Sequence, residues 1–453
     1  MRLASIAPCT PEEDPGYWQW VKIILALFII GSVVFSIGPI RNSIKRPDKN
    51  KDYTRWHYTG EKVIAGEPLY DATDKTEAFY YIYPPFPAVM FYAPASFLGP
   101  IGVAIVVTLT SAISWGIVIV LSVYQVTGRW LHKELMLYLV PCIITAPYVF
   151  DNFLNGQPNI LLLALLMLGL HMMEKGRGAM CGTLIGIAAA FKAFPILILP
   201  YLVWRKAWSA TLVAIVSFVV CSAILPGAFR GFERNANELY QWFDGMILKQ
   251  SGDNVAQRPG RAYRMENQSL MASIHRLTRP AIAGQVGEDE TKTFYVNLMD
   301  IGTRGSNVVF LIATIGLCGA FIAYRPRSGE RNQCVNGIEH AMVLILVLII
   351  TPKVSPYYFF WLYPGLVALL AFFYQAPPES ADRKRYLYAL IGVVALLACA
   401  ISKLWHGTIQ AYGMTTWGAL LLYSMLCLLM VRARKSLDET SDSGPPHESP
   451  TAS

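Results

Sequence analysis

A carboxylate surrounded by aromatic and basic side chains is the feature of this sequence that most directly suggests chemistry. Asp52 stands in the segment KDYTRWHYTG, close to Tyr53, Trp56 and His57. A carboxylate in such a setting can accept a proton from a hydroxyl group, which is the task of a general base. It can equally be a solvated loop acid or the N-cap of a helix that begins near Tyr53. The residues alone leave these alternatives open.

Two further polar groups interrupt apolar segments. Lys192 stands in FKAFP, where an ionisable group is costly unless it is functional, reaches an interface, or lines a helix break at Pro195. The segment NGQPN places Gln157 and Asn159 at a tight turn before a predicted helix, where simple capping geometry is the alternative to a functional role.

A third group of candidates lies in the second half of the chain. Asn267, Gln268 and Ser269 form a glycosylation sequon, although a structural or substrate-contacting role is an alternative to modification. Arg276 follows on the same predicted helix, from which its guanidinium could reach a phosphate.

Lys353, Tyr357 and Tyr358 stand where two apolar runs meet. Tyrosines in such a place suit stacking on a sugar, but they also serve as interfacial anchors. Asp71, which closes GEPLYD, is a possible second functional acid, or a cap or turn residue.

The composition defines the class of protein that must position these residues. Of 453 residues, 54% are hydrophobic and only 15% are charged, and the mean hydropathy is +0.40. These values exclude an ordinary soluble globule of this size. The eight cysteines show no metal-ligand spacing, and the formal charge of +8 suits anionic lipid or phosphate. We find no nucleic-acid-binding module.

Apolar runs of membrane-spanning length recur along the chain and predict an all-α polytopic membrane protein with about twelve spans, between eleven and thirteen. The expected organisation is a cytoplasmic tail over 1–17, a transmembrane domain over 18–431 with long loops at 41–83 and 226–306, and a disordered cytoplasmic tail over 432–453. The expected spans are 18–40, 84–98, 101–126, 135–149, 159–173, 179–203, 211–225, 307–324, 340–351, 357–374, 386–404 and 413–431.

Basic clusters predict the orientation of these spans. Clusters at 205–206, 325–331, 383–385 and 432–435 occupy alternate connections, and the positive-inside rule places all four in the cytoplasm. Counting back puts both long loops outside, including the basic stretch at 41–55 that the rule alone would place inside. Either these cations serve a phosphate group, or a loop of this length escapes the rule.

Several blocks occur in the order found in one enzyme family. They are KDYTRWHYTGEKVIAGEPLYD, YIYPPFPAVMFYAP (which contains Tyr83), NGQPNILLLALLMLGL, GTLIGIAAAFKAFPILILPYLVWRKAW, ENQSLMASIHRL and TPKVSPYYFFWLYP. This set, from Asp52 to Pro364, resembles glycosyltransferase family 87. That family contains polyprenyl-phosphate-mannose-dependent mannosyltransferases of the GT-C superfamily of multi-span enzymes.

The resemblance implies a hexosyltransferase in a bacterial-type inner or plasma membrane, with an extracytoplasmic active site and Asp52 as the catalytic base. A polyprenyl-phosphate sugar, most simply mannose, would be the donor, and a glycan or glycolipid the acceptor. One carboxylate opposite a leaving phosphate gives single displacement with inversion. Arg55, Arg276 or Lys192 would face the phosphate. His57 would orient Asp52 or bind a sugar hydroxyl, and Tyr58 would line the same site.

A multi-span transporter or a flippase for lipid-linked sugars is the alternative function, since it would use a similar cavity. Such proteins usually show paired repeats or matched broken helices, and we find no internal symmetry of that kind. The sequence predicts no cofactor. It leaves dependence on a divalent metal open, with metal independence favoured because the loops contain no paired-aspartate motif.

Overall fold

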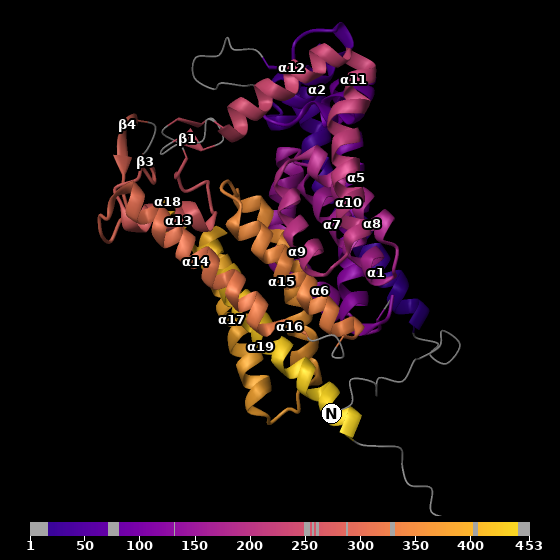
Figure 1. The fold of residues 1–453 in the computed structure, drawn as a ribbon, viewed down its shortest axis with the longest axis vertical. Helices are drawn as coiled ribbons and strands as arrows, with labels where there is room; N and C mark the ends of the chain where they lie inside the picture. Colours follow the sequence, from indigo (N-terminus) through magenta and orange to yellow (C-terminus); the bar gives the residue numbers. More distant parts are fainter. Residues whose placement is uncertain are drawn as a thin grey trace, which may run out of the picture.

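The structure is a computed structural model in which almost every ordered element is a helix (Figure 1). It describes residues 17–70, 81–130, 132–248, 254–255, 258–259, 262–286, 289–326, 331–401 and 406–442. Asp71 and nearly all of the predicted 1–17 tail lie outside the described residues. The predicted all-α polytopic fold is confirmed.

The N-terminal half supplies the elements around Asp52 and Lys192. They are α1 (Tyr17–Lys45), η1 (Pro47–Lys49), α2 (Lys51–Ala65), α3 (Pro85–Pro87), η2 (Ala88–Tyr92), α4 (Ala93–Ser96), α5 (Gly99–Thr127), α6 (Met136–Asn155), α7 (Asn159–Glu174), α8 (Gly178–Phe191), η3 (Phe194–Ile198), α9 (Leu199–Trp204), α10 (Trp208–Val219), η4 (Val220–Ile224) and α11 (Leu225–Arg230).

The C-terminal half adds a second group of long helices and two small hairpins. Its elements are α12 (Phe232–Phe243), η5 (Asp244–Leu248), β1 (Asn254–Val255), β2 (Arg258–Pro259), α13 (Leu270–Thr278), β3 (Gly284–Val286), β4 (Asp289–Phe294), α14 (Gly302–Tyr324), α15 (Gln333–Ile350), η7 (Pro356–Leu362), α16 (Tyr363–Gln375), α17 (Ala381–Ile401), α18 (His406–Ala411) and α19 (Met414–Asp442). The strands pair antiparallel, β1 with β2 and β3 with β4.

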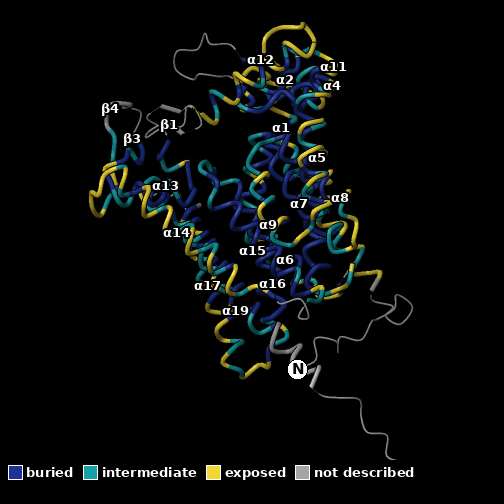
Figure 2. The backbone as a smooth tube through the Cα atoms, viewed as in Figure 1, coloured by how far each residue is buried: buried dark blue, intermediate teal, exposed yellow. Residues whose placement is uncertain are grey.

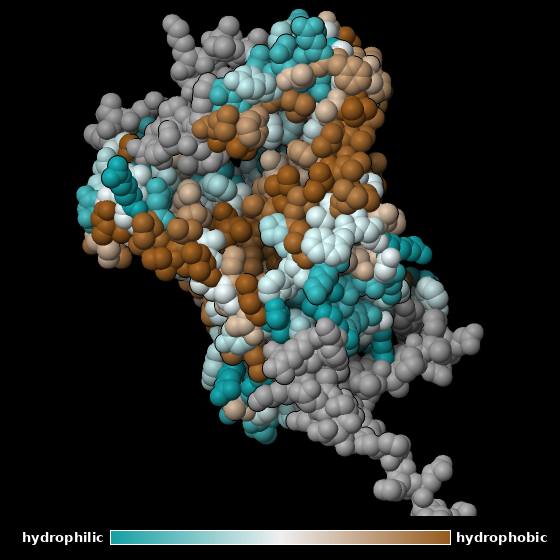
Figure 3. All heavy atoms as spheres, in the orientation of Figure 1, coloured by the Kyte–Doolittle hydropathy of each residue, from teal (hydrophilic) through white to brown (hydrophobic). Residues whose placement is uncertain are grey.

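Helices α7, α15 and α16 form the centre of the protein. Their side chains are largely buried, whereas α1 and α14 expose apolar residues along most of their length (Figure 2). Exposed apolar side chains are costly in water but not against lipid tails. They form a hydrophobic band between hydrophilic regions at the two ends of the molecule (Figure 3). We conclude that this band faces the membrane.

Among the described residues, eight helices are long and apolar enough to cross a membrane, and three shorter apolar helices accompany them. The three are α7, α8 and the continuous η3–α9 segment. With α17, which has an apolar C-terminal part, they make twelve elements that cross all or part of the apolar layer. This agrees with the expected number, but two of the predicted segments differ from the structure.

The first difference concerns residues 84–98, which were expected to form one span. The segment instead forms α3, η2 and α4, three pieces of three to five residues each. The three pieces follow one another without a break as a helix of 12 residues whose middle, η2, is π-helical, and prolines at 84, 85, 87 and 94 remove backbone donors at its start and within it. This helix packs against α2, and at about 18 Å it is too short to cross a hydrocarbon core of about 30 Å.

The second difference concerns residues 179–203, which fold as a hairpin and not as one span. Helix α8 ends at Phe191, Lys192 is extended (φ −159°, ψ 127°), and η3 and α9 follow. Gly178, Gly182 and Gly186 approach successively later residues of α10, so α8 and α10 run parallel. The intervening η3–α9 segment must therefore return to the end where α8 began.

The number of spans stays the same, because the hairpin adds one crossing and the segment 84–98 removes one. The helices between these two segments therefore cross the membrane in the direction opposite to the expected one, and the later helices cross in the expected direction. As a result, the turn that holds Gln157 lies beside Asp52, and the clusters at 205–206 and 325–331 lie at the opposite end.

The two predicted loops are also more ordered than expected. Residues 41–83 contain the end of α1, η1 and all of α2, and residues 226–306 contain α12 and α13 with both hairpins. At the C-terminus, α19 continues through the first part of the predicted 432–453 tail to Asp442. Residues 443–453 lie outside the described residues.

The α8–α10 contact depends on the absence of side chains at two glycines. A Cβ at Gly182 would lie 2.4 Å from the Ala210 carbonyl oxygen, and one at Gly186 would lie 2.6 Å from that of Ala214. Neither oxygen can move without disturbing α10. Small residues of this kind allow close helix packing within membranes.

We therefore expect Gly182→Ala to destabilise the protein by about 1–3 kcal/mol through overpacking. The apparent melting temperature of purified protein in detergent should fall. Gly316→Ala is the matched control, because a Cβ on that α14 glycine meets nothing within 4 Å. Equal melting temperatures for the two variants would contradict the close packing of α8 on α10.

Candidate active site

The position of Asp52 is set by the junction between α1 and α2. Asn50, just before α2, donates from Nδ2 to the Pro39 carbonyl oxygen (2.9 Å) and to Ser43 Oγ (2.6 Å), both in α1. Asp52 follows in the first turn of α2, where a negative charge is favoured by the helix dipole. The end of α1 thus fixes the start of the helix that carries the carboxylate.

Each oxygen of the Asp52 carboxylate has a partner. Gln157 donates from Nε2 to Oδ2, and Arg55 Nη1 lies 3.3 Å from Oδ1. The Asp52 side chain remains 24% exposed, so it is held in one orientation and still accessible. A fixed and accessible carboxylate is the arrangement that a general base requires.

A continuous chain of hydrogen bonds leads from Asp52 to Lys192. Tyr83 donates from its hydroxyl group to Gln157 Oε1 (2.7 Å), and Lys192 Nζ donates to the Tyr83 hydroxyl (3.0 Å) and to Asn159 Oδ1 (3.1 Å). Burial raises the pKa of Tyr83 well above its usual value, so the hydroxyl keeps its proton. The Asp52 carboxylate and the Lys192 ammonium group are therefore linked through only two side chains.

Aromatic rings surround the Lys192 ammonium group. Nζ lies 4.7 Å from the centre of the Tyr83 ring and 4.9 Å from that of Tyr358. Tyr358 in turn stacks on Tyr357, with ring centres 5.3 Å apart. Cation–π contacts of this kind stabilise an ammonium group that has left bulk water. The tip of the hairpin therefore carries a positive charge in an aromatic environment.

Trp56 joins α2 to the rest of the site. It is fully buried, donates from Nε1 to the Gly156 carbonyl oxygen (2.7 Å), and stacks against Tyr83 and Tyr92 at 5.0 and 4.8 Å. Gly156 has φ +67°, and a Cβ there would lie 2.9 Å from the Tyr53 ring. Glycine at this turn therefore allows both α2 aromatics to pack against the Gln157 segment.

The structure brings together many of the sequence candidates but separates others. Asp52, Arg55, Tyr83, Gln157, Asn159, Lys192, Tyr357 and Tyr358 form one connected group. Lys353 precedes the Tyr357–Tyr358 pair in the segment before η7. His57 and Tyr58 lie on α2 but turn elsewhere, since His57 Nε2 is 3.4 Å from Glu61 and the exposed Tyr58 ring lies 5.1 Å from Lys62 Nζ.

Asn267 and Gln268 hold backbone segments together and are fully buried, contrary to the expectation that they contact substrate. Asn267 donates to the Ala262 and Pro352 carbonyl oxygens, and Gln268 donates to those of Met265 and Gln410. An asparagine buried in this way cannot serve as a glycosylation acceptor in the folded protein.

Arg276 also differs from expectation, because its guanidinium group already has a full set of partners. It donates to the carbonyl oxygens of Ala411, Tyr263, Arg264 and Asn267 and to the hydroxyl group of Ser273. Burial lowers the pKa of Arg276 to about 9. The side chain is fully buried, and we therefore assign it a structural role and not contact with a phosphate.

Asn152 is a member of the group that sequence analysis missed. Its Nδ2 donates to the Gln157 carbonyl oxygen (2.9 Å), and its Oδ1 accepts from Asn159 Nδ2 (3.3 Å). The signal was present in the sequence, because the segment DNFLNGQPN is unusually rich in amides for the end of an apolar run. No group of three or more residues suited to hold a metal ion occurs within the described part of the chain.

The opposite end of the same helices carries an ionic cluster. Arg205 bonds to Glu174 (2.8 Å) and to Glu339 (3.0 Å), and Arg331 bonds to Glu339 (2.7 Å). Arg325 lies over the Trp204 ring at 4.5 Å, so it belongs to the same end. The cluster joins the ends of α7 and α9 to the start of α15.

Comparison with known proteins gives a family match and distant structural likenesses to solved chains, among them two structures of one protein. The model of glycosyltransferase family 87 matches residues 81–352. A crystal structure of ArnT from Cupriavidus metallidurans bound to undecaprenyl phosphate is 12% identical, with a TM-score of 0.37, and an apo structure of the same protein is 13% identical, with a TM-score of 0.43. Both alignments cover 94% of this chain and 79% of ArnT. No curated protein matches the sequence.

The structural assignment of Arg276 predicts a loss of stability when it is replaced. Arg276→Gln should cost about 3–5 kcal/mol, because removing a buried charged group leaves several carbonyl oxygens without donors. Thermal unfolding of the purified variant measures this, with Arg304→Gln, an exposed arginine on α14, as the control. An Arg276→Gln protein of unchanged melting temperature but lost activity would instead support a role in substrate binding.

Proposed function

The chain belongs to glycosyltransferase family 87, and from this premise we propose that it transfers mannose from a polyprenyl phosphate to a hydroxyl group of a glycan or glycolipid. Asp52 is the general base of this reaction. The observation that carries the proposal is the position of its carboxylate, which Gln157 and Arg55 orient while it remains accessible.

The reaction is a single displacement at the anomeric carbon. Asp52 accepts the proton of the acceptor hydroxyl as the oxygen forms its bond to that carbon. The bond from the anomeric carbon to the phosphate oxygen breaks at the same time, and its electron pair leaves with the polyprenyl phosphate. Because attack and departure occur on opposite faces of the sugar, the anomeric configuration is inverted.

Lys192 is the cation best suited to the departing phosphate. Of the three cations that the sequence suggested for this role, Arg276 has a structural role and Arg55 is paired with Asp52. Lys192 lies two side chains from Asp52, at the far end of the hydrogen-bond chain through Tyr83 and Gln157. A fixed positive charge stabilises the negative charge that the phosphate gains as the bond breaks.

The distribution of basic residues supports an extracytoplasmic location for this site. Arg205, Arg325 and Arg331 lie together at the end of the helices away from Asp52. Arg432 bonds to Asp382, which joins the basic segments at the start of α17 and the end of α19. The positive-inside rule places these segments in the cytoplasm and Asp52 on the other side of a bacterial-type inner or plasma membrane.

Replacement of the base should remove activity without unfolding the protein. We expect Asp52→Asn to lower the rate of sugar transfer by about 10²–10⁴-fold, because the amide cannot accept the proton. The assay measures transfer from a labelled polyprenyl-phosphate mannose by purified protein. Asp48→Asn, in η1 and outside the hydrogen-bond chain, should retain activity. Full activity of Asp52→Asn would end the assignment of the base.

Replacement of the cation should affect the same step. Lys192→Met removes the charge but keeps an apolar chain of similar length, and we expect kcat to fall about 10²–10³-fold. Tyr83→Phe removes the hydroxyl group that donates to Gln157 and accepts from Lys192, but it keeps the charge of Lys192, so its effect should be smaller. Single-turnover measurements with both variants test this order, and the reverse order would contradict the role of Lys192.

The same purified protein separates sugar transfer from lipid transport. In proteoliposomes that contain polyprenyl phosphates carrying mannose, glucose or galactose, we expect a glycosylated acceptor product with the mannose donor. Movement of intact donor across the bilayer, with no product formed under any of these conditions, would instead favour the transporter.

A further inference from the structure

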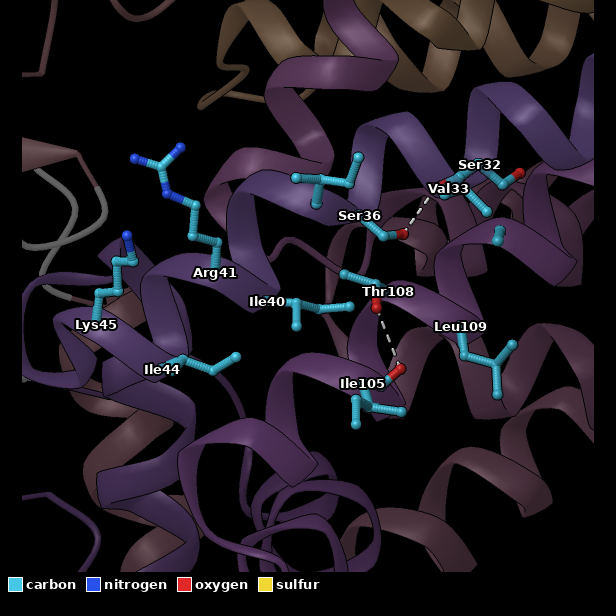
Figure 4. A pocket seen from close by; sticks show the side chains of 12 residues that line it. Ser32, Val33, Ser36, Ile40, Arg41, Ile44, Lys45, Ile105, Thr108 and Leu109 are labelled. Carbon is cyan, nitrogen blue, oxygen red and sulfur yellow. Dashed lines mark hydrogen bonds between the residues drawn. The ribbon is translucent and has the colours of Figure 1, made fainter.

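A groove on the lipid-facing side of the protein ends at two cations. It lies between α1 and α5, has a volume of about 580 Å³, and is lined mainly by apolar side chains such as Ile37, Ile40 and Leu109. Arg41 and Lys45 extend from α1 at one end of it (Figure 4). Among the residues that the structure describes, neither cation forms a hydrogen bond or an ion pair with another.

The groove exists because small residues face each other across the two helices. Ser32 and Ser36 of α1 and Thr108 and Ala112 of α5 line its walls. The hydroxyl groups of Ser36 and Thr108 donate to the carbonyl oxygens of Ser32 and Ala104 in their own helices. The walls therefore offer an apolar surface to an occupant, and the charged groups are confined to one end.

The two cations point away from the reaction site. Residues two apart on an α-helix differ by about 200° in direction, so Arg41 and Lys45 lie on the side of α1 opposite Pro39 and Ser43. Pro39 and Ser43 are the residues that bind Asn50 and fix the start of α2. A phosphate bound at Arg41 and Lys45 would therefore lie on the opposite side of α1 from the contacts that position Asn50 and Asp52.

The length of the groove matches one leaflet of a membrane. From Ser32 to Lys45, α1 rises about 20 Å, whereas half of the hydrocarbon core is about 15 Å thick. The remaining length accommodates a headgroup at the cations. An acyl chain of one leaflet fills this length, while a long isoprenoid chain would extend beyond it.

We propose that the groove between α1 and α5 binds one anionic glycerophospholipid of the surrounding leaflet. Its phosphate group lies against Arg41 and Lys45, and an acyl chain lies along the apolar walls. Three features favour this lipid. The cations at the end of the groove match its phosphate, the apolar walls match an acyl chain, and the length of the groove matches one leaflet. The site is separate from the donor site, and its occupancy does not depend on catalysis by Asp52.

Lipid binding to delipidated, purified protein tests the proposal. Native mass spectrometry with phosphatidylglycerol should show one retained lipid, and the Arg41→Gln/Lys45→Gln protein should bind it about 25-fold more weakly, at about fivefold for each cation. Arg46→Gln/Lys49→Gln is the matched control, because it removes two nearby exposed cations that do not line the groove. The control should bind within about twofold of the unaltered protein.

A second variant tests the apolar walls without changing charge. Ser36 is half-buried on the lipid-facing helix α1, and Ser36→Leu places a larger apolar side chain in the groove, so folding should be preserved, as size-exclusion chromatography can verify. It should also reduce retention of the lipid.

Four results would overturn the proposal. They are equal losses in the two double variants, equally tight binding of zwitterionic phosphatidylcholine, unchanged binding by Ser36→Leu, and displacement of phosphatidylglycerol by equimolar polyprenyl phosphate. The last result would make the groove a donor site. A failure of this kind leaves the Asp52→Asn result unaffected, so the two proposals can fail separately.

Discussion

The need to stabilise one ammonium group inside an apolar protein organises this site. Lys192 is half-buried at the tip of a helical hairpin, where its ammonium group lies against two tyrosine rings and donates to two oxygen acceptors. An ionisable group in such surroundings is costly unless each donor finds a partner. Tyr83 and Asn159 accept hydrogen bonds from the ammonium group. Tyr83 also donates to Gln157, and Asn159 lies two residues after Gln157 in the chain. The contacts of the lysine therefore also position Gln157, the partner of the Asp52 carboxylate.

The hairpin can present Lys192 in this way because its other end is anchored. Arg205 binds Glu174 and Glu339, which joins α9 to the end of α7 and to the start of α15. The close contact of α8 with α10 at Gly182 holds the other arm. The two arms are thus fixed at their base by charge and along their length by backbone packing, and the position of the tip follows from both.

Much of this architecture could be predicted from the sequence, and the exceptions have physical causes. Hydropathy identifies apolar runs, but it does not show whether a run crosses the membrane or turns back. The run around Lys192 turns back because its helix ends at an extended lysine before Pro195, and the run at 84–98 forms a helix of only 12 residues, too short to cross the membrane. The order of the sequence blocks and their residue types identified Asp52 and Gln157 as candidates. The two residues can pair only because these two segments reverse the direction in which the helices between them cross the membrane.

The later candidates show a different limit. Arg276 and Asn267 lie in the loop expected at 226–306, whereas Lys192 interrupts an apolar run, and the residue types alone do not show which of these polar groups faces the site. Their difference lies in what surrounds them, because carbonyl oxygens enclose Arg276 whereas hydroxyl, amide and aromatic groups surround Lys192. Only the three-dimensional arrangement distinguishes an arginine enclosed by carbonyl oxygens from a lysine that belongs to the group around Asp52.

The shortness of the helices that support the hairpin tip bears on the shape of the molecules that can react. Helices α7 and α8 have 16 and 14 residues, which correspond to about 24 and 21 Å, less than the roughly 30 Å of a hydrocarbon core. If their charged ends mark one membrane surface, Lys192 lies at least one helical turn below the other. A molecule that reacts beside Lys192 would then have to bring its hydroxyl group below the level of the lipid headgroups, so the depth of the tip constrains how that molecule approaches the site.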